Sequence, residues 1–258
     1  MSGRDELIEK LYQPTGIDPS ITHDPGAAHL VVHHNEVLGV NLVEGITADT
    51  RTIPDGIKLN LTVAAGAVIA KPVHVCFGML PEDGIQKIDL NIRVEKGGKV
   101  GLYAHCVFPN AVDVRHIMDA RITIEEDASY SYLERHVHGD RGGVKVYPTA
   151  RIELGPRSRF TTEFELLKGR VGEIEIDYET ICREESVMER TARINGSGDD
   201  RIAIREIGHL EGEKARGVLT SRIAVRDQAT AEIYNKLTAS APYARGHVDC
   251  KEIIQDQG

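Results

Sequence analysis

A pattern that recurs about every 30 residues constrains the fold of this chain more than any other feature. Each copy has an apolar residue, any residue, a second apolar residue, a short polar turn, a small residue and another apolar position. The first four copies are 31, 30 and 30 residues apart, beginning at 61, 92, 122 and 152; another copy occupies 223–231, and a looser one begins at 180. A period of this length is typical of stacked repeats that share one core. The pattern therefore predicts a solenoid.

The segments before these turns alternate between apolar and polar residues, as strands with one buried face do. Clear examples are KLNLTV (58–63), DLNIRV (89–94), ARITI (120–124) and SRIAVRD (221–227). From about residue 30 onward, no segment has the pattern of an amphipathic helix of three or more turns. Two strands joined by a tight corner and repeated along an axis describe a β-helix or a serial β-sandwich. We therefore predict an all-β chain that forms a β-helix, with a double-stranded jelly roll as the alternative.

The first residues follow a different pattern. RDELIEKLY (4–12) places its apolar residues on one helical face, and Ser2 and Asp5 have the spacing of a weak capping pair. Three prolines then interrupt regular structure. We expect a short N-terminal helix with a proline-rich loop over residues 1–28, followed by a β-helix core domain over residues 29–258.

Charge and composition exclude several classes of partner. The net charge is −9, whereas binding to nucleic acid depends on a basic surface. Aromatic residues make up only 5% of the chain and tryptophan is absent, so platforms for base stacking are scarce. No apolar stretch approaches the roughly 20 residues of a membrane helix, and the charged N-terminus does not resemble a secretory signal. We expect a cytoplasmic protein that binds neither nucleic acid nor membrane.

The cysteine spacing and the missing motifs exclude several kinds of site. Four cysteines, at positions 76, 106, 182 and 250, include no CxxC pair, so neither a zinc ribbon nor a thioredoxin-like site is expected. The serine-hydrolase elbow and the glycine-rich nucleotide-binding loops are also missing. Any thiol chemistry must therefore be assembled from residues that are distant in sequence, and the chain is not expected to bind ATP itself.

Histidines lie next to two of these cysteines. His74 precedes Cys76 by two residues, so their side chains would share one face of a strand. His105 adjoins Cys106, so those two side chains would point to opposite faces and only one could join an inward-facing site. These four residues are candidates for thiol or metal chemistry, although a buried cysteine usually behaves as a small apolar residue.

A separate pair, His136 and His138, would also share one strand face. Cupin-type jelly rolls supply two of their metal ligands from such a His-x-His pair. The glutamate that this motif needs further along is replaced here by GDRGG (139–143). Because imidazole is the commonest metal ligand in proteins, a mononuclear metal enzyme of jelly-roll type that uses His136 and His138 is kept as the alternative function.

The segment YARGHVDCKEII (243–254) resembles the SufB/SufD family of iron–sulfur cluster assembly scaffolds. The upstream segments TIPDGIKLNLTVAAGAVIAKPVHVCFG and AHCVFP agree with the same family in the same order. The resemblance extends from about residue 30 and is strongest to the short scaffold of archaeal-type systems. It implies a right-handed parallel β-helix that pairs with an identical or paralogous chain, docks a SufC-like ABC ATPase and receives sulfur from a donor protein.

The resemblance also implies roles for particular residues. In SufB-like chains, the cysteine of the RGHV(D/E)C strand is the principal sulfur and iron site, and this chain retains it as Cys250. Cys250 would hold a transient iron–sulfur cluster of undetermined type, because thiolates are the usual cluster ligands. The second-tier candidates for sulfur relay or for metal ligation are Cys106, Cys76, His105 and His74.

Strand alternation adds one constraint on this site. Val248 and Cys250 would share one face, and His247 would lie on the other, so a further ligand is expected from a partner chain. The chain would not be an enzyme, since ATP hydrolysis would belong to the ATPase. A SufD-like structural subunit without a cluster is a further alternative. The C-terminal helices of the family would be absent from the sequence as given, which ends at Gly258.

Overall fold

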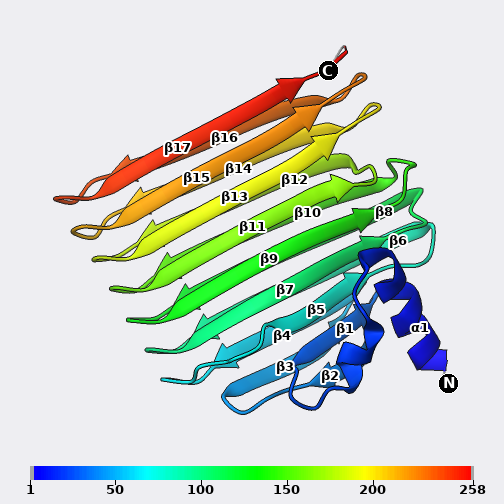
Figure 1. Ribbon diagram of the computed structural model, residues 1–258, viewed down its shortest axis with the longest axis horizontal. Helices are drawn as coiled ribbons and strands as arrows, with labels where there is room; N and C mark the ends of the chain where they lie inside the picture. Colours follow the sequence, from blue (N-terminus) through cyan, green and yellow to red (C-terminus); the bar gives the residue numbers. More distant parts are fainter. Residues whose placement is uncertain (1–2, 257–258) are drawn as a thin grey trace.

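The computed structural model describes residues 3–256, most of which lie in β-strands of two sheets (Figure 1). Sheet A contains, in chain order, β1 (His29–His33), β2 (Glu36–Asn41), β5 (Val73–Gly78), β7 (Lys99–Phe108), β9 (Ser129–His138), β11 (Arg159–Lys168), β13 (Val187–Gly196), β15 (Arg216–Val225) and β17 (Arg245–Ile254). Sheet B contains β3 (Ile46–Ile53), β4 (Gly56–Val63), β6 (Asp83–Val94), β8 (Asp113–Ile124), β10 (Val144–Leu154), β12 (Gly172–Cys182), β14 (Arg201–Leu210) and β16 (Thr230–Ala239).

From β5 to β17 the chain alternates between the two sheets, and each strand pairs in parallel with the strand two further along. Leu61 lies opposite Ile92, and Ile122 lies opposite Ile152, so the sequence period equals one turn of the solenoid. The predicted parallel β-helix is confirmed. The jelly-roll alternative is wrong, because a jelly roll is built from antiparallel strands, whereas these strands pair in parallel.

The repeated turns form one edge of the β-helix, where the chain passes from sheet B to sheet A. One backbone position in each turn adopts a positive φ, and these positions are Gly66, Gly97, Asp127, Arg157, Glu185, Lys214 and Tyr243. At every one of these positions before Tyr243, the amide group donates to a carbonyl of the next turn, as Gly97 N–H does to Glu126 O (2.9 Å). The copy predicted at 223–231 joins β15 to β16 and so lies at the opposite edge, which corrects its expected place in the series.

The β-helix begins with two antiparallel hairpins, β1–β2 and β3–β4. The second hairpin turns at Pro54 and Asp55, where Asp55 has φ 61° and Gly56 follows. No Asn-Gly pair is needed there. The sequence's one Asn-Gly pair, Asn195-Gly196, ends strand β13 and is not a hairpin turn.

The N-terminal region packs against sheet A, as expected for a helical segment with one apolar face. It consists of α1 (Gly3–Tyr12), η1 (Gln13–Thr15) and η2 (Pro19–His23), and it lies over the first strands of the sheet (Figure 1). Leu11 and Tyr12 are buried in a small apolar cluster with Val31 and Cys76. Ser2, the predicted cap, lies outside the described residues.

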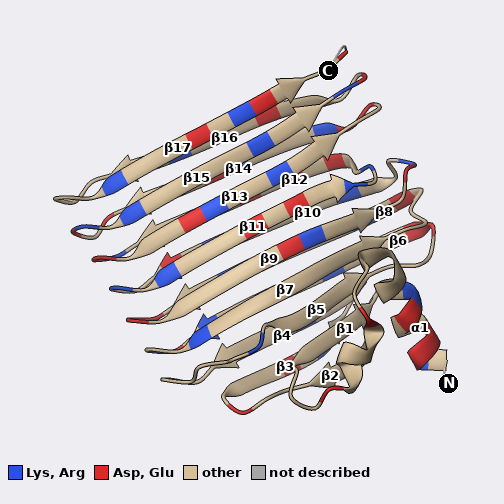
Figure 2. Ribbon diagram, viewed as in Figure 1, with Lys and Arg blue, Asp and Glu red and all other residues tan. Residues whose placement is uncertain are grey.

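The main core lies between the two sheets and is formed by alternate residues of the strands before β17. The outer faces are polar, and opposite charges on neighbouring strands pair across them (Figure 2). Examples are Arg135 with Glu165 and Arg193 with Glu163. The two ends of the chain lie at opposite ends of the β-helix (Figure 1). Within residues 3–256, no helix follows β17, and none of the described helices meets the length and apolarity that a membrane crossing requires.

Candidate functional site

Cys250 lies on β17, the last strand of sheet A, and faces inward. Its cross-strand partner is Ser221 on β15, which in turn lies opposite Ala192 on β13. Ser221 and Ala192 are buried, whereas Cys250 is exposed because none of the described strands covers β17 on its outer side. The thiol therefore stands where the interior of the β-helix meets solvent.

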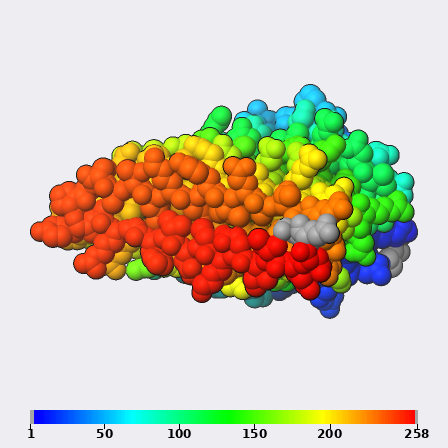
Figure 3. All heavy atoms as spheres, turned by 90° about the horizontal axis from the view of Figure 1, so that it is seen from above, coloured from blue at the N-terminus to red at the C-terminus, as the bar shows by residue number. Residues whose placement is uncertain are grey.

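Asn235 on β16 links the thiol to the interior. Its side-chain nitrogen donates to Ser221 Oγ at 2.8 Å and to Cys250 Sγ at 3.4 Å. Asn235 comes from sheet B and the other two residues come from sheet A, so the contact closes the last rung across its interior. The end of the molecule formed by β16 and β17 is seen in Figure 3.

The outer face of β17 carries charge, as alternation predicts. The Arg222 guanidinium donates two hydrogen bonds to Asp249, one to the carboxylate and one to the backbone carbonyl oxygen. The hydrogen bond from Arg222 is the largest cause that lowers the pKa of Asp249. Asp249 is thus fixed on the face opposite to Cys250. His247 shares that outer face, so the expected separation of His247 from Cys250 is confirmed.

Val248, Glu252 and Ile254 share the inward face of β17 with Cys250 at this end of the β-helix. Val248 lies opposite the buried Leu219 and is itself 39% exposed. Ile253 lies opposite Ala224 on the outer face, whereas Ile254 lies opposite the buried Val225 and is 67% exposed. In earlier rungs the next strand covers the corresponding positions. This surface, defined by Val248, Cys250 and Ile254, is called the terminal edge below.

A second group of chemically active side chains lies in the interior, on β7, β8 and β9. Cys106 Sγ, one ring nitrogen of His116 and one carboxylate oxygen of Glu134 lie within 4.8 Å of one another, and all three residues are buried. The Cys106 thiol donates to Glu134 Oε1 at 3.6 Å. Burial raises the pKa of Glu134 and is the largest cause that raises the pKa of Cys106 well above its usual value.

His136 and His138 face the same interior. His136 Nε2 lies 3.0 Å from Glu134 Oε1, and His136 Nδ1 lies 3.1 Å from His138 Nε2. Burial lowers the pKa of His136 to about 3. The expectation that the two histidines share a face is therefore correct, although the fold around them is a solenoid.

The sequence patterns did not single out Glu134 and His116 as partners of this group. Glu134 precedes His136 by two residues, so its inward direction follows from the alternation that places His136 inside. His116 comes from β8 in the opposite sheet, and nothing local in the sequence shows that it meets Cys106. Only the stacking of rungs brings these residues together.

The remaining sequence candidates lie on the outer side of sheet A. Cys76 is buried beneath α1 against Leu11 and Tyr12, and burial raises the pKa of its thiol to about 12. His105 packs against the Tyr103 ring, with ring centroids 4.2 Å apart, and burial lowers its pKa to about 4. His74 lies 5.7 Å from the same ring. As expected, His105 and Cys106 point to opposite faces.

The structure therefore does not bring the candidate cysteines into one site. Cys106 on β7 and Cys250 on β17 are separated by five strand steps in sheet A. With strands about 4.8 Å apart, this corresponds to about 24 Å. Cys76 lies one strand further away, on β5, and on the other face. These thiols cannot bind one ion together within a single chain.

Polar side chains occupy the interior between Cys106 and Cys250. Arg190 and Glu206 form a buried ion pair at 3.1 Å, and the guanidinium carbon of Arg190 lies 4.4 Å from the centre of the Tyr178 ring. Tyr132 and Tyr178 are also in the interior, and burial is the largest cause that raises the pKa of each well above its usual value. The interior of the β-helix is thus polar over several consecutive rungs.

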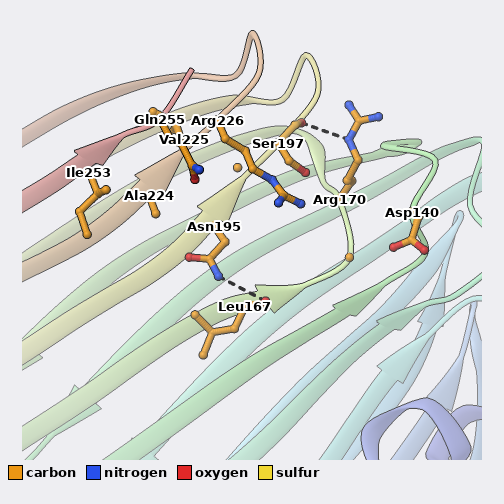
Figure 4. A pocket seen from close by; sticks show the side chains of 12 residues that line it. Asp140, Leu167, Arg170, Asn195, Ser197, Ala224, Val225, Arg226, Ile253 and Gln255 are labelled. Carbon is orange, nitrogen blue, oxygen red and sulfur yellow. Dashed lines mark hydrogen bonds between the residues drawn. The ribbon is translucent and has the colours of Figure 1, made fainter. Parts of the chain in front are cut away.

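A groove of about 460 Å³ lies at the edge where the chain passes from sheet A to sheet B (Figure 4). Its lining contains neither cysteine nor histidine. Arg170, at one side, donates to Ser197 O and forms ion pairs with Asp199 and Asp200. Asn195 donates to Leu167 O. These polar groups are already paired within the turns of the β-helix, and the groove has no thiol or imidazole. It is therefore not the candidate site.

Comparison with known proteins places the chain in a family. It is 32% identical over 250 residues to an iron–sulfur cluster assembly SufBD family protein of Methanocaldococcus jannaschii, covering 97% of this chain and 79% of that protein. It is 31% identical over 250 residues to a Pyrococcus horikoshii protein of the same family name, covering 97% of this chain and 76% of that protein. No protein-family model matches the chain. The resemblance seen in the sequence is confirmed: the chain belongs to the SufBD family of iron–sulfur cluster assembly proteins.

Proposed function

We propose that this chain is a scaffold subunit on which an iron–sulfur cluster is assembled, with Cys250 as its primary sulfur acceptor and cluster ligand. The exposure of Cys250 at the terminal edge is the observation that supports this role. The other three cysteines are buried. A thiol must be accessible and become a thiolate before it can bind iron or accept sulfur.

The proposed cluster is cargo and is assembled between two chains. Within one chain, Asn235 is the side chain that contacts Cys250 Sγ, and an amide is a poor ligand for iron compared with a thiolate. Further ligands would come from an identical or paralogous chain docked at the terminal edge. β16 and β17 have one unpaired side each among the described strands, and such edges favour pairing with another chain.

The partners remain those that the family resemblance implies: a SufC-like ATPase and a sulfur donor protein. ATP hydrolysis would occur on the ATPase, so the chain itself would act without catalysing a reaction. Cys106, Cys76, His105 and His74 stay predicted second-tier sites. Their positions separate them from Cys250, so each would act independently of the proposed cluster ligand.

Anaerobic reconstitution with ferrous iron and sulfide tests the proposal. The wild-type chain should gain the visible absorption of a thiolate-bound cluster, together with iron and acid-labile sulfide. Cys250→Ser should lose most of the sulfide and the absorption. Cys182→Ala is the matched control, because it also leaves three cysteines but removes one that is buried in the core.

Two outcomes would contradict the proposal. Equal sulfide binding by Cys250→Ser and wild type would show that Cys250 is not the ligand. A wild-type chain that binds no sulfide, alone or with a paralogous chain, would favour the SufD-like structural subunit. Iron or zinc without sulfide, lost in a His138→Ala variant and accompanied by turnover of a substrate, would instead favour a metal enzyme.

Pairing at the terminal edge is tested separately by light scattering. Val248→Lys places a charge on the inward side of this edge and should shift a dimer toward monomer. Val40→Lys is the control, since Val40 is 54% exposed on β2 at the other end of sheet A. A dimer that survives Val248→Lys but is lost with Val40→Lys would place the interface at the β2 end of sheet A and would contradict pairing at the terminal edge.

A further inference from the structure

Side chains from both sheets converge on one point of the buried interior. Cys106 on β7 and Glu134 on β9 project inward from sheet A, and His116 on β8 projects inward from sheet B. Their potential ligand atoms lie within 4.8 Å of one another. Thiolate, imidazole and carboxylate together form a ligand set suited to zinc or ferrous iron.

His116 is the most informative member of this group. It is 1% exposed, and neither of its ring nitrogens has a hydrogen-bond partner among the described residues. Leaving a buried polar group without a partner costs about 1–3 kcal/mol. Its ring is surrounded by other rings, with Phe108 at 5.0 Å and His136 at 5.9 Å between centroids. A buried imidazole without a partner needs an interaction that the protein alone does not supply.

A chain of hydrogen bonds orients a second imidazole toward the same point. The carbonyl oxygen of Arg170 lies 3.2 Å from His138 Nδ1 and can only accept, so His138 Nδ1 carries a proton. In a neutral ring His138 Nε2 then accepts, and it accepts from His136 Nδ1 at 3.1 Å. This leaves the lone pair of His136 Nε2 facing Glu134 Oε1, 3.0 Å away.

This arrangement matches the support that metal-binding histidines usually have. A ligating imidazole typically donates its other N–H to a carbonyl or to another acceptor, which fixes its tautomer and its orientation. Here His138 and the Arg170 carbonyl fix His136 in this way. Without an ion, the proton of Glu134 lies between Glu134 Oε1 and His136 Nε2.

Charge and geometry both favour a divalent ion at this point. If Cys106 and Glu134 lose their protons, their two negative charges balance one M²⁺, so the buried group stays neutral overall. Metal bonds of about 2.0–2.3 Å with tetrahedral angles place ligand atoms about 3.3–3.8 Å apart. Cys106 Sγ and Glu134 Oε1 are already 3.6 Å apart. Small side-chain rotations therefore suffice for Cys106, His116 and Glu134, whereas His136 lies outside the group whose ligand atoms are all within 4.8 Å of one another and must rotate further to join it.

We propose that the interior of the β-helix binds one divalent transition-metal ion, zinc or ferrous iron, through four side chains: Cys106, His116, Glu134 and His136. His138 is a positioning residue that holds His136 in its ligating tautomer. This site lies about 24 Å from Cys250, estimated from the strand spacing, so it binds its ion independently of the proposed cluster site.

Cobalt is a suitable probe because it substitutes for zinc and reports its ligands by absorption. The chain is produced in cells supplied with cobalt, so that metal is present while the interior closes, and is then purified without oxygen. We expect about one cobalt ion per chain, a thiolate-to-cobalt charge-transfer band and the intense visible bands of a four-coordinate ion. Cys106→Ala should lose the charge-transfer band, and His116→Leu should lose at least nine-tenths of the cobalt.

Cys250→Ser and Cys182→Ala are the controls and should retain both the cobalt and its bands. His138→Phe should bind cobalt about 10–100-fold more weakly, as expected for loss of a residue that supports a ligand. A variant that is merely misfolded must be distinguished from one that has lost only a metal ligand. Each variant's thermal unfolding is therefore measured with and without metal, and only chains with an intact site should be stabilised by it.

Several results would overturn the inference. One is a wild-type chain without cobalt or with a spectrum that lacks the thiolate band. Another is a Cys106→Ala chain that keeps the band, or a Cys250→Ser chain that loses it. Where Cys106→Ala fails to fold, Cys106→Ser replaces it, since a hydroxyl of similar shape fills the position and should also abolish the thiolate band.

Discussion

Ser221 and Cys250 lie directly opposite each other on β15 and β17, with side chains on the same inward face, yet only Ser221 is buried. The side chain of Asn235 contacts both. The difference in exposure arises because β17 covers Ser221, while no described strand covers Cys250. A position that is buried in the core of an earlier rung is therefore exposed to solvent in the last rung, where it carries a thiol.

This difference predicts how the four thiols react. In the folded chain, one thiol should react quickly with a maleimide, and peptide mapping should identify it as Cys250. Cys76, Cys106 and Cys182 should react only when the chain is unfolded, because each is buried. Rapid modification of Cys106 under native conditions would show that the interior opens more readily than its packing indicates.

The buried pair of Arg190 and Glu206 gives a prediction for stability. Arg190→Met should lower the free energy of unfolding by about 3–5 kcal/mol, because Glu206 is left as an unpaired charge in the interior. The double variant Arg190→Met with Glu206→Leu should be less destabilised than Arg190→Met alone. Urea unfolding of the four chains, compared as a double-mutant cycle, measures the coupling. Additive losses would contradict the assigned contact.

Buried histidines predict acid sensitivity. Burial lowers the pKa of His105 to about 4, and it lowers those of His116 and His136 to about 3, whereas in the unfolded chain each titrates near 6.5. Between pH 6.5 and these values, the unfolded state binds protons that the folded state does not bind. Stability should therefore fall as the pH decreases through this window, by about 1.4 kcal/mol per pH unit for each histidine, and should not change through these groups above it.

The raised pKa of Glu134 acts in the opposite direction, since the folded state retains that proton at a higher pH than the unfolded state. Three histidines act against this one glutamate, so the net effect of lowering the pH is still a decrease in the free energy of unfolding. Urea unfolding between about pH 7.5 and pH 5 tests this, above the range where most carboxylates titrate. His105→Phe preserves a ring against Tyr103 and should reduce the slope. An unchanged slope would show that His105 does not contribute.

The turns with positive φ give a prediction for the backbone. Gly97 has φ 71°, and a Cβ added there would have no atom closer than 3.8 Å. Gly97→Ala should therefore cost about 1–2 kcal/mol through backbone strain alone. Gly97→Asn should cost less, because asparagine tolerates this conformation better. Thermal unfolding compares the two, and equal losses would indicate that strain is not the cause.

Much of the fold was predictable because one rung follows another with nearly constant length. The apolar positions at 61, 92, 122 and 152 are aligned in sheet B as the period requires. The segment at 223–231 was misplaced because the two edges of the β-helix use similar turn residues. The opening hairpins were not predicted, since Pro54 and Asp55 form a turn that does not resemble Asn-Gly.

The site was predictable only in part. Alternation correctly separated Val248 and Cys250 from His247, because strand geometry is local. The exposure of Cys250 depends on which strand comes last, and the group around Cys106 depends on contacts between β7, β8 and β9. Such contacts follow from the stacking of rungs and from the opposing sheet, and no single segment of the sequence contains them.

The column of left-handed turns has a consequence for how related chains can differ in length. Each turn completes its own rung, so a whole rung of about 30 residues could be gained or lost without altering its neighbours. Such a change between β11 and β14 would move Cys250 relative to His116 by one strand spacing, about 4.8 Å, and would leave the contacts around both residues intact. The separation between the interior group and the terminal edge is therefore quantised, and evolution can change it only in whole rungs.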